Sequence, residues 1–118
     1  MHPECLRVAL VVSELRAGGM ERVVVHIAAG LSNRGISTMV LCMENPGDLA
    51  DELNATDVHL EALRSDRSMD MGAMWRMRSL LKRFKPAIVN LHDYASAPYA
   101  VAANWIGDRV PIVFTAHG

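Results

Sequence analysis

Short runs of mainly apolar residues alternate along the chain with stretches in which apolar residues recur every three or four positions. The first run is Val8–Val12, and similar runs lie at Met39–Met43, Ile88–Leu91 and Pro111–Phe114. Short, nearly continuous apolar runs of this kind are typical of strands that are buried on both faces of a parallel sheet. Each is therefore predicted to be a strand, and a shorter strand is expected within Val58–Leu63.

The stretches between these runs have the spacing of amphipathic helices. The first helix is expected over residues 20–34, and Gly35 is placed to end it in a left-handed conformation. A later helix must end before Pro86, and an Ala-rich helix over 96–106 can hold Pro98 only in its first turn. The two apolar stripes consist of Val24, Ile27, Ala28 and Leu31, and of Met74, Met77, Leu81 and Phe84.

Strands that alternate with helices imply βαβ units with right-handed crossovers. We therefore predict an α/β fold: a doubly wound, mainly parallel, Rossmann-like sheet with helices on both faces. A length of 118 residues fits a single domain over residues 1–118. Sheets of this kind bind ligands at the carboxyl ends of their strands. That rule directs attention to three loops, at residues 14–20, 92–96 and 115–118.

The composition excludes several classes of function. A net charge of −1 argues against a nucleic-acid partner. Cys5 and Cys42 are too few for a disulfide scaffold or a zinc site. No apolar run approaches the ~18 residues of a membrane span, and the N-terminus lacks the pattern of a signal peptide. We therefore expect a cytoplasmic protein without a metal site.

The loop after the first strand contains Gly18 and Gly19 at the start of the first helix. Backbone N–H groups at a helix N-terminus favour an anion, and adjacent glycines let a ligand approach the main chain. The loop lacks both the dinucleotide fingerprint and the P-loop lysine, so no NAD or P-loop nucleotide is expected. The pair alone fits a phosphate or sugar site and an ordinary tight turn equally well.

Histidines follow two of the predicted strands. His92 and Asp93 follow the run at 88–91, where an imidazole can donate a hydrogen bond to a ligand or act as a general acid or base. The same residues can instead bond only to their own loop. His117 poses the same question near the end of the sequence, whereas His26 and His59 have no neighbours at metal-ligand spacing and are interpreted as structural.

The helix that contains the methionine stripe has a basic opposite side. Its cations are Arg76, Arg78, Lys82, Arg83 and Lys85. Such a face is usually only solvated, and the methionines are most simply core residues. The alternative interpretation is a peripheral contact with an anionic membrane, at the inner face of which the protein would then lie.

Three segments in order resemble glycosyltransferase family 4, also called group 1. Arg7–Gly35 contains the strand, the Gly-Gly-x-Glu-Arg turn and the helix with which these proteins begin. Arg83–His92 is similar to the family's P-D-V-V-H-x-H strand, and Pro111–Gly118 to its P-hydrophobic-V-x-T-x-H-G strand. Together the three segments span nearly the whole chain.

The resemblance implies the N-terminal, acceptor-side half of a GT-B-fold enzyme. Such enzymes are retaining and metal-independent, and they transfer a sugar from a nucleotide-sugar donor to an acceptor, here unknown, often in envelope polysaccharide or glycolipid biosynthesis. The donor is held mainly by a C-terminal domain that these residues do not include. By motif position, Gly18 and Gly19 would line the cleft near the donor phosphates, His92 would be the second histidine of the middle motif, and His117 would be the catalytic histidine at the transferred sugar.

Two positions depart from the family pattern. Ala87 stands where the family usually has Asp, and Asn90 stands where it usually has the first His. We expect the 118-residue chain alone to be inactive, because one wall of a cleft cannot exclude water. The rival hypotheses are a non-enzymatic α/β module that binds a nucleotide or a protein, and a homodimer formed through apolar surface.

Overall fold

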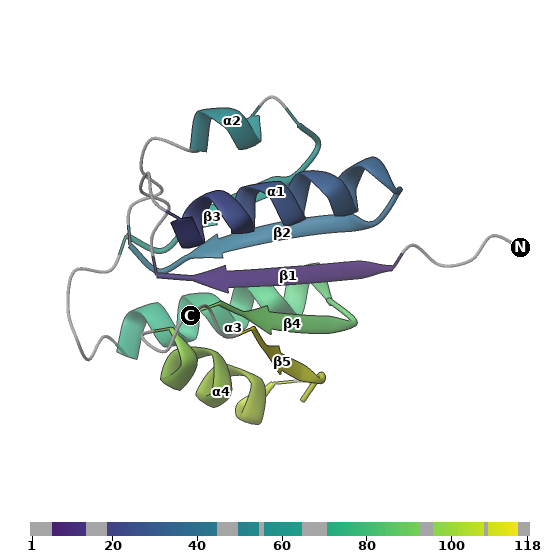
Figure 1. The fold of residues 1–118 in the computed structure, drawn as a ribbon. Coiled ribbons are helices and arrows are strands. Elements are labelled where there is room, and N and C mark those ends of the chain that lie inside the picture. Colours follow the sequence, from purple (N-terminus) through teal and green to yellow (C-terminus); the bar gives the residue numbers. More distant parts are fainter. Residues whose placement is uncertain are drawn as a thin grey trace, which may run out of the picture.

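The computed structural model describes residues 6–13, 19–44, 50–54, 56–64, 71–92, 96–107 and 109–115. Strands and helices alternate along the chain (Figure 1). The strands are β1 (Arg7–Val12), β2 (Ser37–Cys42), β3 (His59–Ala62), β4 (Ile88–Leu91) and β5 (Ile112–Phe114). The helices are α1 (Gly19–Asn33), α2 (Ala50–Asn54), α3 (Met71–Phe84) and α4 (Ala97–Ile106).

The strands form one sheet in the order β3-β2-β1-β4-β5, and every neighbouring pair is parallel. The chain builds outward from β1 to β3 and then returns to the other side of β1 with β4. This reversal is the topological switch point of a doubly wound sheet. The predicted α/β, Rossmann-like fold is confirmed, and the sheet is parallel throughout the described strands.

Each face of the sheet carries its own apolar core. Because successive side chains of a strand point to opposite faces, Leu10 packs under α1 and α2, whereas Val11 packs under α3 and α4. The strands β1 and β2 contribute to both cores, which explains why their sequences show no polar alternation. The α1 side contains Val8, Leu10, Val12, Val24, Ala28, Val40 and Leu53, and the α3 side contains Ala9, Val11, Met39, Leu41, Met77, Leu81, Val89 and Leu91.

The ends of the helices follow the expected signals. Gly35 adopts a φ of +82°, and the N–H of Ile36 after it bonds to the carbonyl of Leu31. This is the left-handed helix end that glycine permits at low cost. α3 ends at Phe84, two residues before Pro86, and Pro98 lies in the first turn of α4. The predicted bounds of the strand at Ile88–Leu91 are those observed, and the other predicted boundaries differ from the observed ones by at most two residues, the usual uncertainty of helix and strand ends.

Candidate active site

The carboxyl edge of the sheet is held together beyond the ends of the strands. The N–H of His92 bonds to the carbonyl of Val11 at 3.0 Å, and the N–H of Thr115 bonds to that of Leu91 at 2.9 Å. The parallel ladder therefore continues for one residue past both β4 and β5. Adjacent strands lie about 4.8 Å apart, so the end of β1, His92 and Thr115 occupy neighbouring positions on one edge.

The other half of this edge is fixed around Ser13, the residue after β1. The carbonyl of Ser13 accepts hydrogen bonds from the N–H of Glu44, at 2.7 Å, and from the Sγ of Cys42, at 3.3 Å. The N–H of Met43 bonds to the carbonyl of Val12 at 2.9 Å. These backbone and thiol hydrogen bonds hold the ends of β1 and β2 in register at this edge of the sheet.

Two helices begin at this edge of the sheet. α1 starts at Gly19 and α4 at Ala97, and both N-terminal ends lie at the end of the sheet to which the strand arrows point (Figure 1). The first N–H groups of a helix have no partner within the helix, and the helix dipole adds positive potential there. The edge between β1 and β4 is therefore suited to a negatively charged ligand group.

His92 is a buried residue of this edge. Only 1% of its surface is exposed, and its Nε2 is among the buried polar atoms. In the register of β4, Asn90 lies beside Leu10, whose side chain packs on the α1 face. The alternation of the strand carries His92 to that same face. A buried imidazole on the face of α1 is held in one position, which suits a residue that orients a ligand.

Three further polar residues of the edge, Asn90, Thr115 and Ser96, are not among the site residues that the sequence predicted. The Nδ2 of Asn90 donates to the Oγ1 of Thr115 at 3.1 Å and to the carbonyl of Val113 at 3.3 Å. Ser96, the residue before α4, is completely buried. A polar Asn within an apolar strand, two positions before His92, was the signal that could have identified the first pair, because residues i and i+2 share a face.

The structure describes some of the predicted site residues and not others. Gly19 is the first residue of α1, and His92 lies at the carboxyl edge of the sheet. Gly18, Asp93 and His117 lie outside the described residues. The roles assigned to all five residues therefore remain predictions.

Other candidate chemistry lies away from this edge. His26 is exposed on α1, and the Nε2 of His59 lies 2.6 Å from the Oε2 of Glu61 on β3. That pair borders an open groove, which is lined also by Ser37, Met39, Leu80, Arg83 and Phe84. Because Ser37 and His59 begin their strands, the groove lies toward the amino ends of the sheet. Within the described ranges, no three residues of types that bind metals cluster as a metal site.

The model of glycosyltransferase family 4 matches residues 17–118. This match covers most of the chain and includes Gly18, Gly19 and the candidate loops at 92–96 and 115–118. The chain belongs to glycosyltransferase family 4. None of the curated proteins compared with it matches.

Membership of glycosyltransferase family 4 gives the carboxyl edge a chemical context. A family 4 domain acts on a sugar donor and an acceptor, and a ligand cleft of a doubly wound sheet opens at the switch point. That point lies between β1 and β4, where Val11 accepts the hydrogen bond of His92. The edge is therefore the candidate active site of this family 4 domain.

Proposed function

We propose that this domain is the acceptor-side half of a retaining, metal-independent glycosyltransferase that uses a nucleotide-sugar donor. A second domain would hold the nucleotide, and the acceptor would bind against the carboxyl edge described above. The observation that carries the proposal is the hydrogen bond between the N–H of His92 and the carbonyl of Val11, at 3.0 Å. It joins the middle motif of the family to the switch point of the sheet.

The chemistry of sugar transfer matches what this edge provides. When the bond between the sugar and the donor phosphate breaks, negative charge develops on the departing phosphate. N–H groups fixed at the start of α1 stabilise such charge without having to reorganise. Gly18 precedes this helix in the sequence, and Gly19 is its first residue. We assign Gly18 and Gly19 to the donor phosphates, and Asp93 to a polar contact with the acceptor.

The imidazoles would orient the sugar. His92 is fixed by burial and by the backbone bond to β1. His117 follows Thr115, the last described residue of the edge, by two positions. We propose that His117 contacts the transferred sugar at the reaction centre. The opposing domain would exclude water, which otherwise hydrolyses the donor.

The cellular context is part of the same proposal. Within the described residues no helix is both long and apolar enough to cross a bilayer. We propose that the protein works in the cytoplasm, in the synthesis of an envelope polysaccharide or glycolipid.

Calorimetric titration of the 118-residue chain with UDP-sugars and GDP-sugars tests whether a second domain is needed to bind the donor. We expect at most weak binding and no sugar transfer, because the donor domain supplies most of the nucleotide contacts. Tight binding of a nucleotide sugar by this chain would contradict the assignment of the donor to a second domain.

A substitution of His117 tests the proposed reaction centre in a chain that carries both halves of the enzyme. His117→Ala should lower turnover by about a hundredfold or more, while the free energy of unfolding changes by less than about 0.5 kcal/mol. His26→Ala is the matched control, because His26 is exposed on α1. Unchanged turnover in His117→Ala would remove this residue from the mechanism.

A further inference from the structure

The outer face of α3 and α4 is unusually apolar for a surface. Nine large apolar side chains are exposed among the described residues, and five of them belong to these two helices. They include both tryptophans of the chain, Trp75 with 52% and Trp105 with 65% of its surface exposed. The other three are Met71, Val101 and Ile106. A cluster of exposed apolar side chains of this kind indicates a surface that binds a membrane or another protein.

Basic residues accompany these tryptophans. The guanidinium carbon of Arg109 lies 4.4 Å from the centre of the Trp105 ring, and that of Arg78 lies 5.8 Å from the centre of the Trp75 ring. The Nε of Arg78 also donates to the carbonyl of Ile106 at 3.3 Å, so this side chain joins the two helices. Cation and indole therefore alternate across a single face made by α3 and α4.

Among the described residues of this face, every charged side chain is a cation. The sequences of α3 and α4 contain no acidic residue, although the chain has 13. The nearest acidic residues in sequence, Asp70 and Asp108, lie outside the described residues. Five of the twelve basic residues fall within positions 71–85. Of these, Arg76 bonds to the carbonyl of Leu63 and Arg83 borders the groove beside His59. The cations that accompany the exposed tryptophans are therefore Arg78 and Lys82 of α3, together with Arg109.

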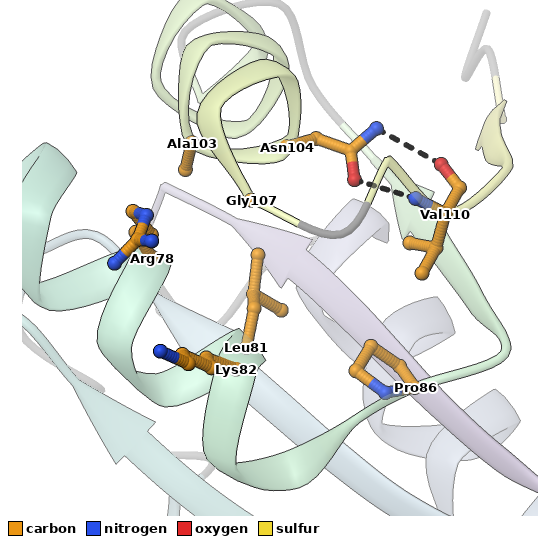
Figure 2. A pocket seen from close by; sticks show the side chains of 8 residues that line it. All are labelled: Arg78, Leu81, Lys82, Pro86, Ala103, Asn104, Gly107 and Val110. Atoms are coloured by element: carbon orange, nitrogen blue, oxygen red, sulfur yellow. Dashed lines mark hydrogen bonds between the residues drawn. The ribbon is translucent and has the colours of Figure 1, made fainter.

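A small notch opens where the two helices meet. It has a volume of about 20 Å³, and Leu81 points into it while Arg78 and Lys82 stand on the α3 side (Figure 2). Asn104 does not face an incoming ligand, because it is paired with both backbone groups of Val110. The space is large enough for about one water or one phosphate oxygen, and two cations stand beside it.

We propose that the outer face of α3 and α4 docks on the surface of an anionic bilayer. Tryptophan prefers the region of lipid headgroups, and Lys and Arg near that surface are attracted to anionic lipids. Trp75 and Trp105 enter the headgroup layer, and Arg78 and Lys82 contact lipid phosphates. The positive charge of Arg78 and Lys82 complements the negative charge of the lipid phosphates, and this favours an anionic bilayer as the partner of the face. The proposal does not depend on which sugar the carboxyl edge transfers.

The two tryptophans make the test direct, because the chain has no other indole. Vesicles of phosphatidylcholine alone are compared with vesicles that contain one third phosphatidylglycerol, by flotation and by tryptophan emission. We expect flotation and a blue shift only with the anionic vesicles. Brominated lipids should quench the emission, and 1 M salt should release the protein, since the Debye length falls from about 10 Å at 0.1 M to about 3 Å.

Variants locate the contact on this face. Lys82→Gln should weaken vesicle binding about fivefold, whereas Arg34→Gln, which removes an exposed cation at the end of α1, should not. Trp75→Ala with Trp105→Ala should weaken it about tenfold or more, whereas Val23→Ala should not. Circular dichroism checks that the double variant folds, and Lys82→Gln tests the proposal independently of it.

Several results would overturn the proposal. They are equal binding to neutral vesicles, no binding to either kind, and binding that Lys82→Gln and Arg34→Gln weaken alike. A blue shift that grows with protein concentration in the absence of vesicles, together with a dimer in sedimentation, would assign the face to a second copy of the chain instead.

Discussion

Asn90 and Thr115 are joined side chain to side chain across β4 and β5. The Nδ2 of Asn90 lies 3.1 Å from the Oγ1 of Thr115, and the hydroxyl of Thr115 lies 3.4 Å from the Oδ1 of Asn90. The amide also reaches the carbonyl of Val113. β5 has three residues and lies at the end of the sheet order, so this polar contact helps to hold a short terminal strand. It thereby fixes the position from which the chain continues toward His117.

A double-mutant cycle measures the contact. Asn90→Ala and Thr115→Val should each lower the free energy of unfolding by about 1 kcal/mol. The double variant should lose less than the sum, with a coupling of about 0.5 to 1 kcal/mol. Urea denaturation followed by circular dichroism gives all the values.

The matched control for this cycle combines Asn90→Ala with Thr38→Val. Thr38 is a buried threonine of β2, two strands away from Asn90, and its Oγ1 bonds to the carbonyl of Ile36 at 2.9 Å. Its effect should add to that of Asn90→Ala within about 0.5 kcal/mol. If the effects of Asn90→Ala and Thr115→Val were also additive, the contact between these two side chains would contribute nothing to the free energy of unfolding.

Two glycines near the end of α1 should respond in opposite directions to alanine. Gly35→Ala should destabilise the fold by about 1 kcal/mol, because an alanine is strained at a φ of +82°. Gly30→Ala should stabilise it by about 1 kcal/mol, because Gly30 is exposed within the helix and a Cβ there meets no atom within 4 Å. Thermal unfolding should separate the two variants by roughly 8 °C or more, and a change of the same sign in both would contradict this account of the helix end.

Replacing a methionine of α3 by alanine should lower the free energy of unfolding only where that methionine is buried. Met77 is completely buried in the core beneath α3 and α4, whereas 60% of Met71 is exposed. Met77→Ala should cost about 3 kcal/mol of unfolding free energy, from lost burial and from the cavity it leaves. Met71→Ala should change it by less than about 0.5 kcal/mol. Equal costs, measured by chemical denaturation, would mean that the helix packs by another face.

An exposed ion pair joins α1 to α2 and should contribute little. Arg22 and Glu52 approach to 3.4 Å, and their side chains are 64% and 46% exposed. Solvent screening limits pairs of this kind to a few tenths of a kcal/mol, so Glu52→Gln should shift the unfolding midpoint by less than about 2 °C. A larger shift would mean that the pair, rather than Leu53 in the core, anchors α2.

The sequence by itself determined the order of elements and the fold class. The runs at 8–12 and 39–43 are apolar at every position because their strands have a core on both sides, and a pattern of this kind is enough to indicate a parallel sheet. Gly35 and Pro86 mark helix ends for reasons that are local to the backbone. The motifs near Gly19, His92 and His117 likewise indicated the family, over nearly the same residues as the match at 17–118.

Only the tertiary structure decided which of these residues meet. Periodicity says which face of an element is apolar, but it does not say which strands are neighbours. The pairing of β1 with β4 places His92 beside Val11, and the pairing of β4 with β5 places Asn90 beside Thr115. The packing of α3 against α4 likewise brought Trp75 and Trp105, which are distant in the sequence, onto one surface, with Arg78 and Arg109 beside them. Such contacts depend on the order of strands in the sheet, which arises from the packing of the whole chain.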